Sequence, residues 1–349
     1  MAFCLSGGVD SNTIVSVAKK KFNLKVKTFS IIDKKGGFDE LKNIQKTVNY
    51  LKTKHTNLIV KIKDSFKSLE KMIDYHDGPI ITSNYFYHSF LLKKIAQSGH
   101  KVVFSGTAAD EIFSGYYDHS LQFLHEVKDK KNFLKYLNYW ETGIGKFIKN
   151  KTFQDPYLYI KNPTYRKHMF EYSDVFSTAI KKNKKKHLKK FIETKFCTSL
   201  LRNRMMNELF FEGTRPILQA DDANSMFYSI ENRSPFLDKD LVEFMYTVPT
   251  NLLMEKGFTK SILRESMRGI VLDDILNEKE KSGFNVNVQS MFDFNSQYMK
   301  NNIINKNNKI FSIIDRSFVI SILKNPDSVK KYSKFIFSFI NASIFLKKN

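Results

Sequence analysis

Two short segments of the chain place carboxylates and hydroxyls beside glycines, directly after apolar runs. The first is Ser6-Gly7-Gly8-Val9-Asp10-Ser11, which follows Phe3-Cys4-Leu5. Glycines allow successive backbone N–H groups to converge on an anion, and the start of a following helix adds partial positive charge. Asp10 would repel a phosphate unless a cation lay between them, so the segment predicts a phosphate site with Mg²⁺. The simpler alternative is a strand-to-helix turn with a capping Asp or Ser.

The second segment is Ser105-Gly106-Thr107-Ala108-Ala109-Asp110-Glu111, which follows the apolar run Val102-Val103-Phe104. Taken alone, Asp110 and Glu111 fit acidic residues in the first turn of a helix. Ligands of parallel sheets bind at the carboxyl ends of the strands, and both segments follow expected strands. We therefore expect Asp10 and Asp110 to share one Mg²⁺ bound to a pyrophosphate.

Other common nucleotide and metal motifs are absent from the sequence. The segment Gly145-Lys146-Phe147 lacks the Ser or Thr of a Walker A loop, and Gly143-Ile144-Gly145 lacks the third glycine of a dinucleotide fingerprint. The eight histidines show no HExxH or Cys/His spacing, which argues against a zinc site. Two cysteines, Cys4 and Cys197, form no disulfide framework, which favours a reduced, cytoplasmic protein.

Apolar patterning in the first third alternates between strand-like and helix-like segments. An amphipathic helix follows the first segment, with Ile14, Val15, Ala18 and Phe22 as its expected buried stripe. Alternation of this kind predicts a doubly wound, parallel α/β sheet. The apolar stretch 335–346 is shorter than the roughly 20 residues that span a bilayer, so we expect a buried C-terminal helix and no membrane partner. Further strands are expected at 26–32, 55–62 and 102–105, and further helices at 38–51 and 64–75.

The chain of 349 residues has a formal net charge of +22, with 57 Lys and Arg against 35 Asp and Glu. Its densest basic run, residues 181–190, lacks interleaved aromatic residues and arginines. We expect this run to be a solvated face, and an RNA- or anion-binding surface is the alternative.

Four segments together resemble one known family. SGGVDS resembles the PP-loop of ATP pyrophosphatases, and SGTAADEIFSGY, NSMFYSIENRSPFLD and GFTKSILRESM follow it in the order found in the synthetase domain of glutamine-hydrolysing asparagine synthetases. The resemblance covers about residues 3–284 and implies a single domain over 1–349. Its expected parts are a nucleotide-binding core (1–118), a helical insertion (119–198), a helical part with acceptor and phosphate motifs (199–285) and a helical tail (286–349).

The resemblance also implies roles for individual residues. Asp10, Asp110 and Lys260 are the implied catalytic residues: the two aspartates hold Mg²⁺, and Lys260 stabilises the charge on leaving pyrophosphate. Acceptor-binding roles are implied less directly, because Arg233 and Asp238 also suit a structural role in the ENRSPFLD segment. The role of Glu231 in the same segment is equally undecided between the two. The implied contacts to ATP or pyrophosphate are Cys4, Leu5, Ser6, Gly7, Gly8, Ser11, Ile31, Ser105, Gly106 and Lys281, and those to the acceptor are Thr107, Glu111, Arg233 and Asp238.

The sequence departs from the family in two respects. The family usually has a glutamate, thought to assist proton removal or to hold the acceptor's charge, where this chain has Thr107. The family's glutaminase domain with its N-terminal catalytic cysteine has no counterpart, since residue 2 is Ala2 and the chain begins where the synthetase domain would begin. We therefore expect ammonium, or ammonia from a separate glutaminase subunit, as the nitrogen source.

The expected activity is that of an ATP- and Mg²⁺-dependent ligase. It activates a carboxylate, the side chain of aspartate in the first instance, as an acyl-adenylate with release of pyrophosphate, and ammonia then displaces AMP. One alternative keeps this chemistry and changes the acceptor, for example to a sugar acid of surface-glycan assembly, as the Thr107 departure allows. The others are a tRNA-modifying PP-loop enzyme, which the positive charge favours, and a non-catalytic remnant.

Overall fold

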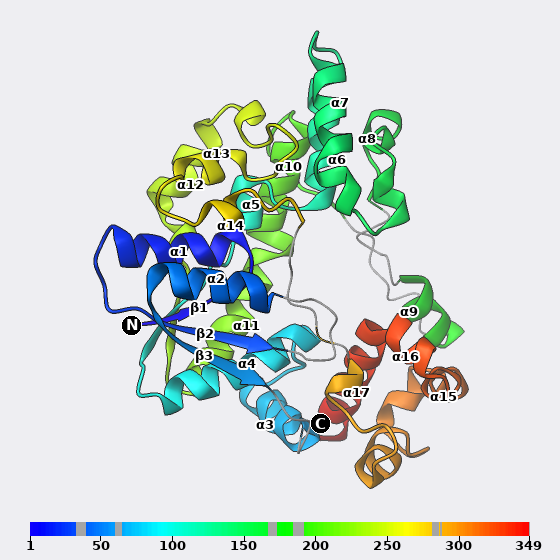
Figure 1. Cartoon of the computed structure of the whole chain (residues 1–349). Helices are drawn as coiled ribbons and strands as arrows, with labels where there is room; N and C mark the ends of the chain where they lie inside the picture. Colours follow the sequence, from blue (N-terminus) through cyan, green and yellow to red (C-terminus); the bar gives the residue numbers. More distant parts are fainter. Residues whose placement is uncertain are drawn as a thin grey trace.

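A parallel sheet lies at the centre of the chain (Figure 1). The structure is a computed structural model and describes residues 1–32, 40–59, 65–166, 173–183, 192–280, 286 and 288–348. Every neighbouring pair of strands is parallel, which confirms the α/β class predicted from the sequence. Within the described residues the sheet has the order β3-β2-β1-β4-β5, formed by β1 (Ala2–Cys4), β2 (Lys27–Ile32), β3 (Lys54–Ile59), β4 (Val102–Phe104) and β5 (Glu231–Arg233).

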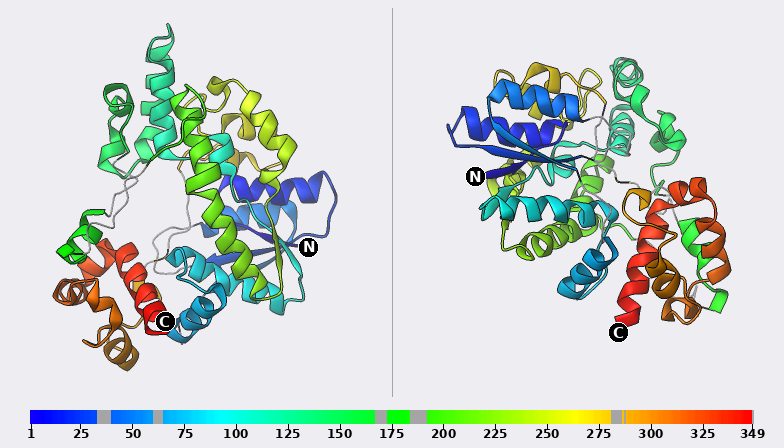
Figure 2. Two further views of the ribbon diagram at one scale, coloured as in Figure 1. Left: turned by 180° about the vertical axis from the view of Figure 1, so that it is seen from behind. Right: turned by 60° about the horizontal axis from the view of Figure 1, so that its bottom comes forward.

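Helices cover both faces of this sheet, so it is buried as parallel sheets are. Successive residues of β1 point to opposite faces: Phe3 packs in a cluster with Val15 and Ile44, and Ala2 packs in another with Leu92. The first cluster lies under α1 (Val9–Lys20) and α2 (Leu41–Leu51), and the second lies over α4 (Ser83–Gln97), beside which α11 (Thr214–Met226) runs (Figures 1 and 2).

The order of the strands reverses at β1, which pairs with β2 on one side and with β4 on the other. The loops that leave β1 and β4 at their carboxyl ends therefore start side by side. Such a reversal point is where ligands bind in open α/β sheets. Both segments that the sequence singled out are these two loops, so the topology brings them together as predicted.

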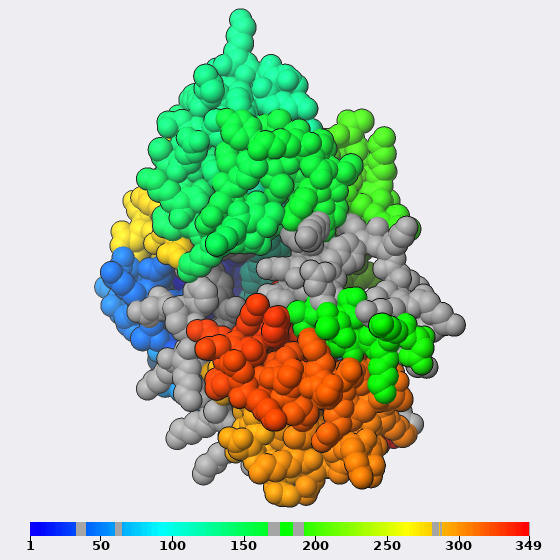
Figure 3. Space-filling view, turned by 90° about the vertical axis from the view of Figure 1, so that its right-hand side faces the viewer, coloured from blue at the N-terminus to red at the C-terminus, as the bar shows by residue number. Residues whose placement is uncertain are grey.

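The remaining helices form three groups, one near the sheet and two farther from it (Figures 1 and 3). Residues 117–161 form one group at the top of Figure 1, and the C-terminal helices form another at the lower right with α9. Beside the sheet lie α3 (Ser65–His76), α5 (Ala109–Phe113), α10 (Leu200–Asn207), α12 (Lys239–Thr247), α13 (Ser261–Ser266) and α14 (Asp273–Leu276); the upper group holds α6 (Tyr117–Val127), α7 (Phe133–Thr142) and α8 (Leu158–Lys161), and the lower group holds α9 (Ser173–Ala179), α15 (Arg316–Leu323), α16 (Pro326–Lys331) and α17 (Ser333–Lys348).

The buried C-terminal helix expected at 335–346 is confirmed as α17, whose residues Phe335 and Ile340 are at most 1% exposed. None of the helices in the described part of the chain combines the length and the apolarity needed to cross a bilayer.

Several boundaries differ from the sequence-based expectation. Phe22 is 67% exposed rather than part of the buried stripe, because α1 ends at Lys20. The helix α4 was not predicted, since its apolar residues are spread around its circumference rather than along one stripe. β5 was also missed, because it is a three-residue edge strand of polar residues that pairs through its backbone. The expected positions 38–39, 60–62 and 64 lie outside the described residues.

Candidate active site

The loop after β1 is held by its own side chains. The backbone N–H of Ser6 donates to Ser11 Oγ at 2.9 Å, and the two hydroxyls of these serines also lie 2.9 Å apart. Asn12, which is fully buried, donates from Nδ2 to the carbonyl oxygens of Ser6 (3.0 Å) and Gly8 (2.7 Å). Gly8 precedes the first residue of α1, so the loop leads directly into the start of a helix. The loop is thus fixed by its own side chains at the start of a helix, a position that favours an anion.

One carboxylate already lies against this loop. The N–H of Gly7 donates to Glu40 Oε2 at 3.4 Å, and a Cβ at Gly7 would come within 3.2 Å of the Cβ of Glu40. Burial raises the pKa of Glu40, while the hydrogen bond from Gly7 opposes that rise. An acidic oxygen therefore accepts from the backbone at the position where a phosphate oxygen is expected.

The loop after β4 contacts the first loop through Gly106. A Cβ on Gly106 would lie 3.0 Å from the backbone nitrogen of Ser11 and 3.1 Å from the Cβ of Asp10. A side chain at position 106 would push the two loops apart. The close approach carries the following residues, including Asp110 in α5, toward Asp10.

Lys260 joins the two loops from a distant part of the sequence. Its Nζ lies 2.6 Å from Asp10 Oδ1 and 2.7 Å from Asp110 Oδ1, and the residue is 5% exposed. Burial lowers the pKa of Lys260, but the charges and hydrogen bonds of Asp10 and Asp110 outweigh it, so the net direction is upward and the ammonium stays protonated. The three residues that the resemblance implied as catalytic therefore form one charged cluster.

The backbone around this cluster is unusually constrained. Ala108, Ser114 and Lys260 have positive φ angles of 74°, 66° and 56°, a region that side chains other than glycine rarely adopt. At Gly115 a Cβ would lie 1.8 Å from Asp110 Oδ1 and 2.3 Å from Lys260 Cε. Only a glycine fits there, and strained residues of this kind cluster at functional sites.

A cavity of about 290 Å³ opens beside the cluster at the carboxyl end of the sheet. Its volume is close to that of small-molecule sites. Most of its lining was implied by the resemblance, and four residues were not: Phe29, Glu40, His88 and Leu91. The implied residues that line it are Cys4, Leu5, Ser6, Asp10, Ser11, Ile31, Gly106 and Thr107.

The other implied residues occupy different positions. Ser105 contacts the lining through Thr107, with 3.0 Å between their hydroxyl oxygens. Glu111 is buried and accepts a hydrogen bond from Tyr116 at 2.8 Å; burial and the neighbouring Asp110 charge raise its pKa to about 7. Lys281 lies outside the described residues.

The ENRSPFLD segment makes structural contacts in the described chain. Arg233 Nε lies 2.7 Å from Glu231 Oε1, and both side chains are more than half exposed. Asp238 caps α12 by accepting from the backbone nitrogens of Asp240 (3.1 Å) and Leu241 (3.2 Å). Neither Arg233 nor Asp238 is among the residues that line the cavity.

His88 in the cavity wall and Asp221 behind it complete the electrostatics of the cavity. His88 Nε2 lies 3.7 Å from Cys4 Sγ, and His88 Nδ1 lies 3.8 Å from Asp221 Oδ1. Asp221 also accepts a hydrogen bond from the Thr107 hydroxyl at 3.4 Å. Burial lowers the pKa of His88 to about 4 and raises that of Asp221 to about 7. Nothing in the local sequence around His88 or Asp221 marks them as part of the site.

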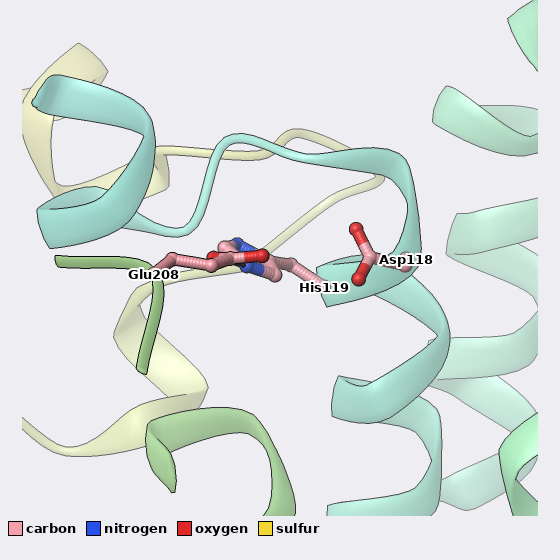
Figure 4. Close-up of side chains that lie close together, drawn as sticks. All are labelled: Asp118, His119 and Glu208. Carbon is pink, nitrogen blue, oxygen red and sulfur yellow. Dashed lines mark hydrogen bonds and ion pairs between the residues drawn. The ribbon is translucent and has the colours of Figure 1, made fainter. Parts of the chain in front are cut away.

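A second buried charged cluster lies nearby, formed by Asp118, His119 and Glu208 (Figure 4). One potential ligand atom from each lies within 4.8 Å of the others. Both oxygens of Glu208 already face donors, since Oε2 lies 2.6 Å from His119 Nε2 and Oε1 accepts from Arg204 Nε at 3.0 Å. Arg204 is itself fully buried. Glu208 therefore joins His119 of α6 to Arg204 of α10 in a buried ion-pair network.

Comparison with known proteins decides the family. The family model described as asparagine synthase matches residues 1–346. The chain belongs to the asparagine synthase family. The predicted relationship is thereby confirmed, and with it the assignment to a family of ligases that use ATP.

Individual relatives agree with this family. The chain is 27% identical over 341 residues to asparagine synthetase [glutamine-hydrolyzing] 1 of Bacillus subtilis, covering 92% of this chain and 51% of the relative. It is 24% identical over 355 residues to asparagine synthetase [glutamine-hydrolyzing] 3 of the same organism, covering 93% and 51%. A putative asparagine synthetase of Methanocaldococcus jannaschii is 36% identical over 119 residues, which is 33% of this chain and 22% of that protein. The chain spans about half the length of the two Bacillus relatives.

Proposed function

We propose that the chain activates the side-chain carboxylate of aspartate with ATP and transfers the resulting acyl group to ammonia. In the first half-reaction a carboxylate oxygen attacks the α-phosphorus of ATP, giving an acyl-adenylate and pyrophosphate. In the second, ammonia attacks the acyl carbon and AMP leaves, giving asparagine. Activation is needed because a free carboxylate is a poor acyl donor.

The observation that carries this proposal is the Asp10–Lys260–Asp110 cluster beside the cavity. A buried ammonium and two carboxylates lie together at the reversal point of the sheet, next to the loop that leads into the start of α1. An ammonium fixed in a poorly solvated site stabilises negative charge that grows on a leaving group. Lys260 is therefore suited to stabilise pyrophosphate as it departs, while Ser6 and Ser11 hold its oxygens.

The same residues fit Mg²⁺. Oxygens of Asp10 and Asp110 lie 2.6 and 2.7 Å from the same Lys260 Nζ atom, so the two carboxylates are close enough to each other to share a second cation beside the ammonium. Gly115 leaves the space that a side chain would otherwise take from Asp110. Mg²⁺ prefers carboxylate and phosphate oxygens. Held by Asp10 and Asp110, it would neutralise part of the charge of the phosphates.

Carboxylate-dependent exchange of labelled pyrophosphate into ATP tests this proposal. We expect exchange that requires Mg²⁺ and aspartate, and net turnover with ammonium that yields AMP and pyrophosphate. Exchange with a sugar acid but not with aspartate would show that the reaction is the proposed one and that the acceptor is a sugar acid instead of aspartate. ADP and phosphate as products would refute the proposal. Turnover that requires RNA and falls steeply with salt would instead support a tRNA-modifying enzyme.

A further inference from the structure

Asp221 is a buried carboxylate directly behind the cavity wall. It lies in α11 and is 4% exposed. Its Oδ2 accepts a hydrogen bond from the hydroxyl of Thr107, and its Oδ1 faces His88 Nδ1 at 3.8 Å. Thr107 and His88 both line the cavity. Asp221 is thus one hydrogen bond away from a cavity that it does not itself line.

The hydrogen bonds of Thr107 define its role. Its hydroxyl proton is given to Asp221, so the hydroxyl of Ser105, 3.0 Å away, is the donor in the contact between these two residues. A hydroxyl oxygen has two acceptor lone pairs. Thr107 therefore keeps one acceptor position beyond those used by its protein partners, and its oxygen belongs to the cavity wall. The Thr107 hydroxyl can therefore accept a hydrogen bond from an N–H group in the cavity while it donates its own proton to Asp221 on the other side.

The second half-reaction needs such an acceptor. When neutral ammonia attacks an acyl carbon, the nitrogen becomes positively charged and must lose a proton as the amide forms. A positioned base assists this step. Provided that the proposed function holds, we propose that Asp221 is a positioning residue that receives this proton through Thr107.

The step balances as follows. The C–N bond forms as ammonia attacks, and one N–H proton passes to Thr107 Oγ1 while the proton of Thr107 passes to Asp221 Oδ2. The C–O bond to the adenylate then breaks, and AMP leaves with the bonding electron pair. Asp221 later releases the proton to solvent, so the acyl-adenylate and ammonia give the amide, AMP and one proton.

Among the described residues, the titratable groups that face Asp221 carry no positive charge at neutral pH. Burial lowers the pKa of His88 to about 4, so this imidazole is neutral. Burial and the Asp221 charge raise the pKa of the Cys4 thiol to about 12 and also raise that of Tyr85. Thr107 does not ionise. Burial raises the pKa of Asp221 itself to about 7, despite the hydrogen bond from Thr107, so the carboxylate becomes a proton acceptor as the pH rises through neutrality.

The test compares Asp221→Asn with Asp222→Asn, a matched control in which the adjacent, exposed aspartate of the same helix is changed. Both half-reactions are measured in the full chain: aspartate-dependent ATP–pyrophosphate exchange, and AMP formation at a fixed concentration of free ammonia over a range of pH. Hydroxylamine serves as a second acceptor, because it is a strong nucleophile that depends less on a base. Thr107→Val removes the hydroxyl at nearly constant volume and tests the same relay if Asp221→Asn does not fold.

In Asp221→Asn we expect ammonia-dependent turnover to fall about 100-fold. Exchange and turnover with hydroxylamine should stay close to those of the wild type, and the rise of turnover near pH 7 should disappear. Asp222→Asn should behave as the wild type. Unchanged ammonia turnover in Asp221→Asn, or an equal loss of exchange and turnover in the folded variant, would overturn the inference. Absence of carboxylate-dependent exchange in the wild type would overturn the proposed function itself.

Discussion

Replacing Lys260 by alanine removes the ammonium that contacts both Asp10 and Asp110. The two carboxylates, whose side chains are 25% and 21% exposed, would then lose the ammonium that bridges them. The variant should therefore be less stable in the absence of Mg²⁺, and it should also activate the carboxylate more slowly. These two effects have different physical origins and are measured separately.

The size of the stability effect follows from the contacts. At an effective dielectric constant of about 20, each contact between unit charges at such distances amounts to about 6 kcal/mol of attraction. Desolvation of the charges offsets most of it, and removing one partner of a buried pair costs about 3–5 kcal/mol. Because both aspartates keep some contact with water, we expect a loss of about 3 kcal/mol in the free energy of unfolding. Mg²⁺ should restore part of it, since a ligand that binds only the folded state stabilises it.

The catalytic effect should appear in the rate of adenylate formation. Loss of one charge-stabilising donor lowers kcat about 100- to 1,000-fold. ATP affinity should change much less, because the charge that Lys260 opposes grows as pyrophosphate departs. The assays are urea unfolding with and without Mg²⁺, and ATP–pyrophosphate exchange as a function of ATP concentration.

Lys239→Ala is the control, because the Lys239 side chain is 82% exposed and lies 3.7 Å from Glu243. Its effect on the free energy of unfolding should stay below about 0.5 kcal/mol. An unchanged stability of Lys260→Ala together with an effect confined to KM would refute the reasoning.

Three further predictions follow from named contacts. Asp10→Asn or Asp110→Asn should lower exchange about 100-fold while leaving urea unfolding cooperative, and near wild-type exchange in either would contradict a shared cation site. Burial lowers the pKa of His119, but the charge and hydrogen bond of Glu208 raise it by more, so the net pKa lies above the usual value of 6.5. In urea unfolding, the wild type should therefore be more stable than His119→Gln, with the full difference below about pH 6.5. This difference should decrease as the pH rises through the raised pKa of His119 in the folded protein. A difference that does not change with pH would argue against the ion pair. Cys4 should not hydrolyse glutamine, because burial raises the pKa of its thiol to about 12 and leaves little thiolate. We therefore expect the chain to use ammonium, and stoichiometric glutamate release from glutamine would show that this expectation is wrong.

The parts of the fold and site that the sequence predicted are those with a local signal. Both loops were indicated by the same pattern, in which glycines, hydroxyls and a carboxylate follow an apolar run. Their proximity could also be predicted, because strand order in a parallel sheet is sufficient to bring them together. Asp10 and Asp110 could be paired on this basis alone. Lys260, 250 residues from Asp10, could be added only through the family resemblance, since no spacing rule relates the two positions.

The residues that were missed depend on tertiary contacts. Asn12 holds the first loop from inside α1, where its side chain looks like an ordinary polar position of a helix. Glu40 reaches the cavity from the residue before α2, His88 reaches it from α4, and Asp221 lies behind its wall in α11. Each is significant only because of what lies opposite. In the sequence Asp221 is indistinguishable from Asp222; burial alone separates their chemistry.

The central claim, that a carboxylate oxygen of the acceptor attacks the α-phosphorus of ATP, is tested most directly by following that oxygen. Aspartate labelled with ¹⁸O in its side-chain carboxylate is turned over with ATP, Mg²⁺ and ammonium, and the products are examined by mass spectrometry. The acyl-adenylate route predicts one ¹⁸O atom in each AMP and none in pyrophosphate. Unlabelled AMP, or ¹⁸O in inorganic phosphate formed together with ADP, would contradict it.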